Sequence, residues 1–402
     1  MKKKVVSLLL AAAMTTAALA GCGSSNGSSS SDASTGADST SATSASASTD
    51  GEKKDAAGEK IAMITDSGDI TDESFNQITW ETVCAYGDAN GVEYEYYKPA
   101  EDTDEERINS IDLAVSEGAT VVVMPGYLFG PAIAEEQDTY PDVTFIAVDV
   151  TEGDIVKNGK AVDLGKNVYI CSFEEEQAGY LAGYAAVKDG YTSLGFLGGI
   201  AVPAVIRFGY GYVQGINAAA EEDGVDVNVK YYYGGQFYGD ANITSRMEGW
   251  YANGTQIVFA CGGGIYTSAV EAALKNNGYV VGVDVDQNYI GANGVEKDGY
   301  AYNPFITSAM KGLSESVSTA LGDIEAGEWS NIAATNGNFG LEDGDYVGLP
   351  TADDSWNFKT FTKDEYEALK SKIASGELVV DNSSDDATKP TVSEFTTVNY
   401  IQ

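Results

Sequence analysis

The stretch Thr120–Gly126 reads TVVVMPG and decides the fold, because three successive valines end at a proline and a glycine. A strand buried on both faces needs such an uninterrupted apolar run, whereas a half-exposed strand alternates apolar and polar residues. Strand-like runs also lie at 61–65, 92–97 and 143–148, and segments with helical spacing occupy 75–90 and 104–117. This alternation predicts an α/β fold in which helices cover both faces of a parallel sheet.

The same pattern begins again after Ser172, where a predicted helix at 174–188 precedes a predicted strand at 193–197. Two such units in tandem predict two Rossmann-like lobes with a cleft between them. The remaining predicted elements are helices at 205–222, 241–251, 267–277, 304–321 and 363–373, and strands at 225–233, 256–260 and 280–283. We expect lobe one to hold 59–173 and about 300–345, and lobe two to hold 174–299 and about 346–402.

The N-terminus carries an export signal. Three lysines at 2–4 precede the apolar run Val5–Leu19, which is too short to span a membrane comfortably. The following Leu19-Ala20-Gly21-Cys22 resembles the lipobox of bacterial lipoproteins. The alternatives are an ordinary signal peptide with an accidental cysteine and a short transmembrane anchor. The resemblance implies removal of a signal peptide at 1–21, lipidation of Cys22 and anchoring at the extracytoplasmic face of the cell membrane. Residues 22–58 are rich in Ser, Thr and Ala, so they predict a disordered tether.

Composition excludes several classes of function. The 402 residues include no histidine, which removes Ser-His-Asp and Cys-His catalysis and the commonest transition-metal ligand. The formal net charge of −38 argues against a nucleic-acid partner, because the phosphate backbone would be repelled. Besides Cys22, the chain has Cys84, Cys171 and Cys261, which we interpret as small buried apolar residues rather than a disulfide framework.

Aspartates and glycines follow several of the predicted strands. Asp66, Asp149 and Asp284 each come directly after a strand, and Gly262–Gly264 follows the strand at 256–260. Ligands of parallel α/β sheets collect at the carboxyl ends of the strands, where glycines also allow close approach of the backbone. A single aspartate in this position is more often a helix N-cap. Three of them facing one predicted cleft favour a binding site.

An ordered set of motifs resembles one protein family. Thr65–Gly68 (TDSG) and Asp72–Gln77 (DESFNQ) resemble the opening signature of the basic membrane protein family, the substrate-binding lipoproteins of nucleoside ABC transporters. This family includes proteins related to the purine nucleoside receptor of spirochaetes. Further matches are Gly195–Gly199, Phe208 with Gly211 and Gly215, Phe259–Gly264, Val281–Gln287 and Thr307–Lys311, so the resemblance runs from Lys60 to Leu321.

The resemblance implies a type I periplasmic-binding-protein fold with two lobes, a three-strand hinge and a nucleoside held between aromatic rings and carboxylates. By position, it gives Asp284 and Lys311 as the pair that holds the ribose hydroxyls and Phe75 as the ring that stacks on the base. The other ligand-binding residues it implies are Asp66 and Asn76 as polar contacts from lobe one, Asp149 as a further carboxylate, Gly263 in the Gly-rich loop, and Tyr266 as the second stacking aromatic. The loop at 127–131 (YLFGP) lacks the acidic residue that many family members carry there.

The sequence therefore predicts a monomeric, lipid-anchored solute-binding protein of an ABC importer, with nucleosides, purine nucleosides foremost, as ligand and permease subunits as partners. We expect no catalytic residues, cofactor or metal, and closure of the lobes by hinge bending. The alternatives are binding of a sugar or another small polar solute, and a nutrient-sensing receptor. A nucleoside hydrolase using Asp66, Asp69 and Asp72 is more remote, because the sequence offers no second half of a metal site.

Overall fold

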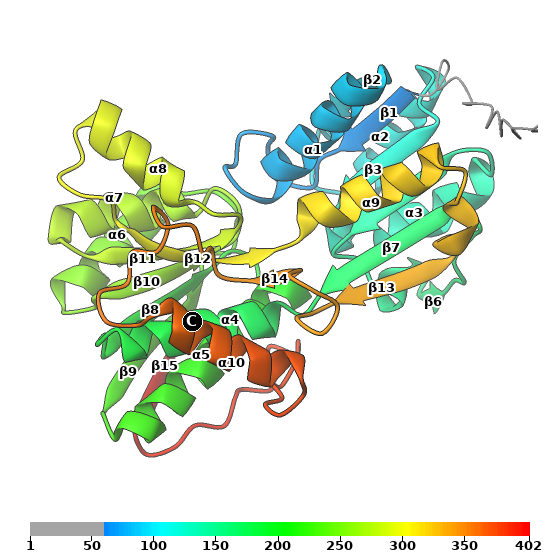
Figure 1. Ribbon diagram of the computed structural model, residues 1–402. Coiled ribbons are helices and arrows are strands. Elements are labelled where there is room, and N and C mark those ends of the chain that lie inside the picture. The colour runs from blue at the N-terminus through cyan, green and yellow to red at the C-terminus, as the bar shows by residue number, and fades with distance from the viewer. Residues whose placement is uncertain (1–59) are drawn as a thin grey trace, which may run out of the picture. The chain divides into compact units, whose positions relative to one another are not determined.

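The computed structural model describes residues 60–402 (Figure 1). The predicted signal peptide at 1–21, the lipidation of Cys22 and the tether at 22–58 lie outside the described residues. Residues 60–402 form two large β-sheets, each with helices on both faces, which confirms the predicted α/β fold with two lobes. Within this part of the chain, no helix has the length and apolar character needed to cross a membrane.

The first sheet has six parallel strands in the order β13-β7-β4-β3-β1-β2. All of β3 is buried, as its valine run predicts, and the strands predicted at 61–65, 92–97, 120–124 and 143–148 are confirmed to within one residue. The bounds are β1 Lys60–Ile64, β2 Glu93–Tyr97, β3 Val121–Pro125, β4 Thr144–Val148, β7 Val168–Phe173 and β13 Thr335–Phe339.

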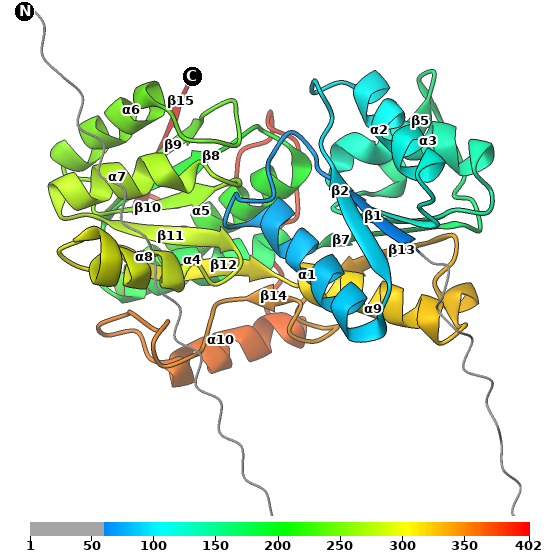
Figure 2. The ribbon, with the colours of Figure 1, turned by 90° about the horizontal axis from the view of Figure 1, so that it is seen from above.

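Two pairs of helices cover the first sheet. Helices α1 (Phe75–Asn90) and α9 (Leu313–Glu325) pack together on one face, and α2 (Asp104–Ser116) and α3 (Gly130–Thr139) pack on the other (Figure 2). Short elements fill the connections, namely the 3-10 helices η1 Tyr127–Phe129, η2 Glu152–Asp154 and η4 Trp329–Asn331, and the hairpin β5 Val156–Lys157 with β6 Lys160–Ala161.

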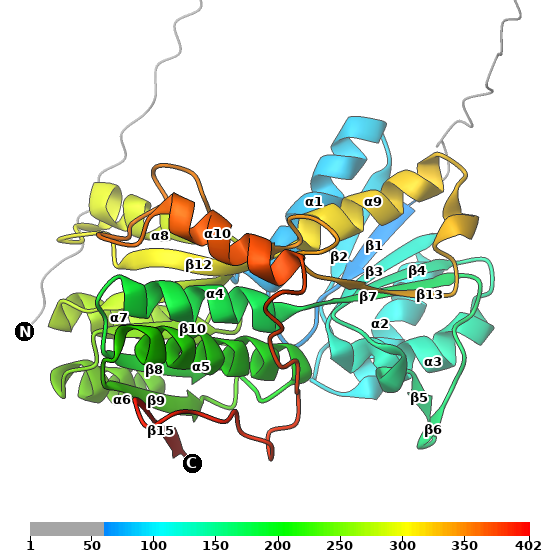
Figure 3. The same ribbon diagram turned by 60° about the horizontal axis from the view of Figure 1, so that its bottom comes forward.

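The second sheet has seven strands in the order β14-β12-β11-β10-β8-β9-β15, parallel except for β14. Helix α10 (Lys363–Ala374) lies beside α4 (Glu175–Lys188), as Figure 3 shows. The strands are β8 Ser193–Gly198, β9 Val227–Tyr233, β10 Ile257–Cys261, β11 Tyr279–Asp284, β12 Phe305–Lys311, β14 Val347–Gly348 and β15 Thr396–Ile401, and the helices are α4 Glu175–Lys188, α5 Pro203–Asp223, α6 Ala241–Ala252, α7 Tyr266–Asn276, α8 Asn288–Asn293, the π-helical turn η3 Gly294–Asp298 and α10 Lys363–Ala374.

The predicted helix at 304–321 is wrong. Its first half is the strand β12, and only the second half belongs to the helix α9. The strand has the sequence FITSAMK, in which an aromatic and two β-branched residues favour a strand, and Gly312 separates it from the helix. Because β12 pairs with β11, the expected start of the second piece of lobe one at about 300 is also wrong. The strand β15 in the C-terminal tail was not predicted.

The chain passes between the two sheets at three places within the described residues. It crosses after β7, between β12 and α9, and between β13 and β14 (Figure 1). Three neighbouring crossings form the hinge of a two-lobed protein. Lys311 ends β12 and Glu175 begins α4, so these two charged residues lie at the crossings.

Four glycines bring α4 and α5 into unusually close contact. Gly179 and Gly183 lie one turn apart on α4, and Gly211 and Gly215 are spaced in the same way on α5. A Cβ atom at Gly211 would lie 2.0 Å from the backbone oxygen of Glu176, so no other residue fits there without moving a helix. Two of the motif glycines therefore serve helix packing, and the close contact fixes the start of α4 against α5.

The cysteines follow the sequence prediction in part. Cys171 and Cys261 are buried and free, as expected for small apolar residues, whereas Cys84 is a half-buried free thiol.

Candidate functional site

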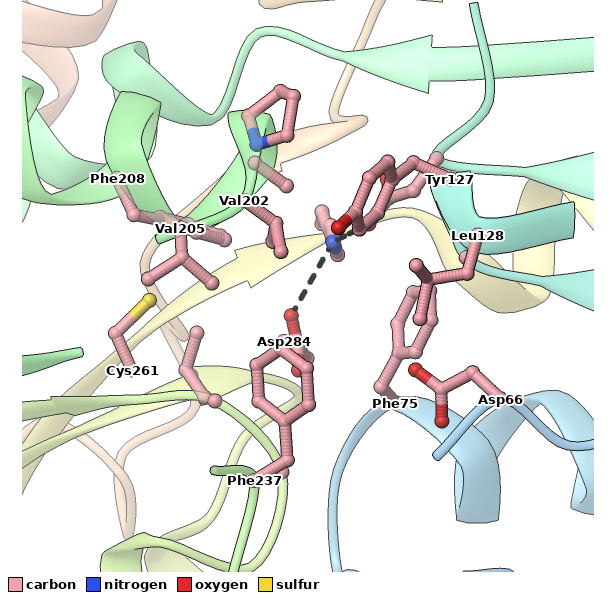
Figure 4. Close-up of a pocket in the computed structure, with 18 of the residues that line it drawn as sticks. Asp66, Phe75, Tyr127, Leu128, Val202, Val205, Phe208, Phe237, Cys261 and Asp284 are labelled. Carbon is pink, nitrogen blue, oxygen red and sulfur yellow. Dashed lines mark hydrogen bonds and ion pairs between the residues drawn. The ribbon is translucent and has the colours of Figure 1, made fainter. Parts of the chain in front are cut away.

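A cavity lies between the two lobes and is lined by residues of both sheets' carboxyl ends (Figure 4). Its empty space measures about 750 Å³, part of which is open to solvent. The structure brings together seven of the eight predicted ligand-binding residues in its wall, namely Asp66, Phe75, Asn76, Asp149, Gly263, Asp284 and Lys311.

The eighth predicted residue, Tyr266, lies outside the lining of this cavity. It is the first residue of α7 and is buried, with its ring centroid 6.3 Å from that of Phe305 in the core of the second lobe. The helix begins one residue earlier than predicted. Tyr266 therefore occupies a helix face that packs on the sheet, rather than the loop that faces the cleft.

Phe237 is an aromatic residue of the cavity wall that the sequence interpretation missed. It comes from the loop after β9, and Figure 4 shows its ring and that of Phe75 reaching the cavity from different elements. A Cβ atom at Gly199 would lie 2.4 Å from the Phe237 ring, and one at Gly262 would lie 2.9 Å from it. The glycines after β8 and β10 thus make room for this ring, which is a tertiary relationship with no local signal.

Asn76 and two aspartates form a polar network at the lobe-one side of the cavity. The Asn76 amide donates to Asp66 Oδ1 at 2.9 Å and to Asp72 Oδ2 at 3.0 Å, and its own oxygen accepts from the backbone N–H of Asp66 at 3.3 Å. The Asp66 carboxylate also accepts from the backbone N–H of Gly68 at 2.7 Å. Since the amide of Asn76 is fully used, Asn76 orients Asp66, which keeps its second oxygen for the cavity.

Asp72 hydrogen-bonds the backbone at the start of helix α1. Capping a helix in this way was the alternative role for the aspartates that follow strands. The Asp72 carboxylate accepts from the backbone N–H groups of Ser74, Asn76 and Gln77 at 2.9 to 3.1 Å, at the start of α1. Burial raises the pKa of Asp72 to about 6, against the effect of these hydrogen bonds. In the described part of the chain, Asp149 and Asp284 accept no such backbone bonds, so they are not helix caps.

Lys311 is the centre of a buried cluster of carboxylates. Its ammonium donates to Asp149 Oδ2, and lies 3.5 Å from Asp284 Oδ1 and 3.7 Å from Glu175 Oε1. The side chains of Lys311 and Glu175 are 3% and 0% exposed, so these charges interact away from bulk water. The ammonium also lies 4.7 Å from the centroid of the Phe75 ring, within range of a cation–π interaction.

The cluster changes the acid–base properties of its members. Burial raises the pKa of Asp149 to about 7, against the opposing effect of the Lys311 ammonium. Burial alone would lower the pKa of Lys311, but the surrounding carboxylates outweigh it and raise that pKa above its usual range. Lys311 therefore stays charged. Asp149 Oδ1 is buried and has no hydrogen-bond partner among the described residues, so it can accept a hydrogen bond from a ligand.

Arg207 is a second cation of the cavity that was not predicted. It lines the cavity, and its Nε donates to Glu175 Oε2 at 2.6 Å. Arg207 is the single basic residue of α5 and directly precedes Phe208 of the motif, which was the available signal. Glu175 thus lies between Arg207 and Lys311 and joins the two cations into one network.

Asp149 and Asp284 both have left-handed backbone conformations, with φ of 58° and 66°. Such conformations are unfavourable for residues other than glycine and concentrate at functional sites, where the surrounding structure holds them. Asp149 directly follows β4, and Asp284 is the last residue of β11. The strain is consistent with carboxylates that are turned toward the cleft for binding.

Comparisons with known proteins show the family of the chain. Residues 59–384 match the family model Bmp, described as ABC transporter substrate-binding protein PnrA-like. The chain belongs to this family. It is a substrate-binding protein of ABC transporters and not an enzyme.

Two curated relatives and one solved structure illustrate the relationship. The ABC transporter nucleoside-binding protein BmpA of Lactococcus lactis is 28% identical over 324 residues, which cover 77% of this chain and 82% of that protein. Basic membrane protein B of Borreliella burgdorferi is 26% identical, over 80% of this chain and 87% of the relative. A crystal structure of an ABC transporter solute-binding protein from Aeropyrum pernix has a TM-score of 0.69 at 19% identity, over 82% of this chain and 95% of that chain, which supports the fold.

The groups that line the cavity are of the kinds that a substrate-binding protein uses. A substrate-binding protein needs complementary groups and not a reacting nucleophile, and the cavity offers carboxylates, two cations and aromatic rings. Carboxylates accept from ligand hydroxyl or N–H groups, the cations donate to ligand oxygens, and the rings cover apolar faces.

Proposed function

We propose that this chain binds nucleosides, purine nucleosides foremost, in the interlobe cavity and delivers them to the permease of an ABC importer. It acts as a monomer that is anchored through a lipid on Cys22 at the extracytoplasmic face of the cell membrane. The lobes close around the ligand by bending at the hinge.

The observation that carries this proposal is the placement of Asp149, Asp284 and Lys311 beside the ring of Phe75. A ribose diol presents two donors and several acceptors, which two carboxylates and one ammonium complement. A planar base needs apolar walls, which Phe75 and Phe237 supply from the two lobes. The printed name of the Lactococcus relative, a nucleoside-binding protein, supports the same ligand class.

A thermal-shift screen of the purified chain without its lipid tests the ligand class. The ligands are adenosine, guanosine, inosine, their free bases, ribose and galactose. A ligand at one hundred times its dissociation constant stabilises the protein by about 2.7 kcal/mol, which is easily measured. We expect the shift with nucleosides, and the largest with a purine nucleoside. A shift with a sugar and none with any nucleoside would overturn the proposal.

Asp284→Ala tests the assignment of the cavity. Charge-assisted hydrogen bonds contribute roughly 1.5–3 kcal/mol each, so calorimetry on the folded variant should show at least a tenfold loss of nucleoside affinity. The matched control is Asp226→Ala, which removes an exposed aspartate of the same lobe and should leave the affinity unchanged. Equal affinities of the two variants would contradict the assignment.

The anchor has its own test. Growth of cells that express the chain with labelled palmitate should give a labelled protein in the membrane fraction. Cys22→Ser should abolish the label and release the protein, because the lipobox resemblance implies that lipidation begins at the cysteine thiol. An equally labelled variant would show that Cys22 is not the site.

A further inference from the structure

Ser74 of the first lobe contacts the cavity carboxylate of the second lobe. Its hydroxyl donates to Asp284 Oδ2 at 2.5 Å, across 210 positions of sequence. The two residues are 1% and 5% exposed, so this is a buried, charge-assisted hydrogen bond. The other oxygen of Asp284 lies 3.5 Å from the Lys311 ammonium. Both oxygens of Asp284 are therefore oriented, one by each lobe.

Two more bonds join the same pair of turns. Gln287 Nε2 donates to the backbone oxygen of Glu73 at 2.8 Å, and the Tyr289 hydroxyl donates to the Glu73 carboxylate. Gln287 is 0% exposed, and its Oε1 accepts from the backbone N–H of Val283 at 3.1 Å. The glutamine is thus fixed within the second lobe and presents its amide to the first.

The backbone at both turns is strained. Glu73 has φ of 53°, and Asp284 has φ of 66°. Neither residue is a glycine, so each conformation persists because the surrounding contacts hold it. The bonds between the turns supply such contacts, and they exist only while the lobes are together.

We propose that Ser74 is a positioning residue for Asp284, and that Ser74 and Glu73 form a latch with Asp284, Gln287 and Tyr289. The latch favours the closed arrangement of the lobes and orients Asp284 for the ligand. The effect on affinity rests on the proposed nucleoside binding, whereas the effect on closure does not. When the binding-competent state is only partly populated, the apparent dissociation constant rises in inverse proportion to its population. Residues that touch no ligand thus set the affinity.

Two variants test the latch. Ser74→Ala removes the bond to Asp284, and Tyr289→Phe removes the bond to Glu73 from a residue that is 41% exposed, so that its loss cannot disrupt a core. The matched control is Tyr184→Phe, which removes a tyrosine–glutamate bond of 2.6 Å to Glu222 within the second lobe.

The measurements are small-angle X-ray scattering of the ligand-free proteins, calorimetry with inosine, and thermal unfolding. We expect both latch variants to show a larger radius of gyration than wild type, and a dissociation constant for inosine that is roughly tenfold higher. The control should match wild type in both. The unfolding temperature of Tyr289→Phe should stay close to that of the control, which separates a latch from a merely structural role.

Scattering and affinity equal to wild type in both latch variants would overturn the proposal. If wild type binds no inosine, the proposed binding of this nucleoside is wrong. The scattering comparison still decides whether the latch exists. Unchanged scattering in Tyr289→Phe together with unfolding of Ser74→Ala would also count against it, because the Glu73–Tyr289 bond would then contribute nothing to closure.

Discussion

The ammonium of Lys311 contacts the carboxylate of Asp149 across the boundary between the two sheets. Lys311 ends β12 of the second sheet, and Asp149 directly follows β4 of the first. The ion pair is nearly excluded from water, with side chains that are 3% and 9% exposed. A buried pair of this kind contributes little net stability by itself, but removing one partner leaves an uncompensated charge.

We predict that Lys311→Met destabilises the protein by about 3–5 kcal/mol at pH 8. Methionine matches the length of the lysine but leaves Asp149, Glu175 and Asp284 without their shared cation. The loss should be smaller at pH 5, because Asp149, whose pKa burial raises to about 7, then takes up a proton. Urea unfolding at both pH values measures the difference. Lys370→Met, which removes a surface ion pair with Asp345, should cost no more than about 1 kcal/mol at either pH. A loss independent of pH would contradict this account.

The positions of Asp66, Asp149 and Asp284 were predictable because parallel strands align their carboxyl ends at one edge of each sheet. No such rule covers the partners of these carboxylates. Lys311 was predicted from a resemblance but placed in a helix, since the run FITSAMK was merged with the helix that follows it. The bond between Ser74 and Asp284 joins two lobes at a sequence separation of 210, so no local pattern specifies it.

Phe237, rather than Tyr266, lines the cavity as the second aromatic residue, and this difference can be tested. We predict that Phe237→Ala weakens nucleoside binding by about 2 kcal/mol, or roughly thirtyfold, because the ring's apolar contact and its stacking preference are both lost. Tyr266→Leu, which removes the ring but keeps an apolar residue in the core, should leave the affinity of the folded protein within twofold of wild type, since that ring lies outside the cavity lining. Calorimetry decides between them, and a larger effect at Tyr266 would restore the sequence-based assignment.

Phe237 shows why the sequence could not supply the whole site. Its loop follows β9, and its ring occupies space that Gly199 and Gly262 leave open after two other strands. Glycines at these strand ends were predicted to allow close approach of a ligand. Gly199 and Gly262 also allow close approach of an aromatic side chain, and the identity of that side chain depends on how three loops meet.

Burial of Glu176 gives the protein a pH dependence with a definite sign. Glu176 is 2% exposed, and burial, with the neighbouring charge of Glu175, raises its pKa to about 8. The native state therefore binds this proton more tightly than the unfolded state, in which a glutamate titrates near pH 4.3. The contribution of this group to stability consequently falls as the pH rises from about 4.5 to 8.

We predict that Glu176→Gln flattens this decline, because glutamine stays neutral at every pH. The variant should gain stability relative to wild type by up to about 1.4 kcal/mol per pH unit across that window. Urea unfolding at pH 5, 6, 7, 8 and 9 gives the two curves. For Glu221→Gln, an exposed substitution on α5, the curve of stability against pH should run parallel to that of wild type. Parallel curves for Glu176→Gln would show that burial does not protonate this residue.

The glycine contact between α4 and α5 predicts opposite effects of the same substitution at two sites. Gly211→Ala places a Cβ atom 2.0 Å from the Glu176 backbone oxygen, so the helices must separate, at a cost of about 1–3 kcal/mol or more. Gly249→Ala lies on α6, where a Cβ atom meets nothing within 4 Å, and should stabilise the protein by up to about 1 kcal/mol through helix propensity.

Because α4 starts at Glu175 and α5 carries Arg207, separation of the two helices should also disturb the cavity. Nucleoside affinity should therefore fall in Gly211→Ala and remain that of wild type in Gly249→Ala. Equal stability of the two variants would show that the helices tolerate the added methyl group. A destabilised Gly211→Ala with full affinity would show instead that the Glu175–Arg207 pair moves independently of the helix contact.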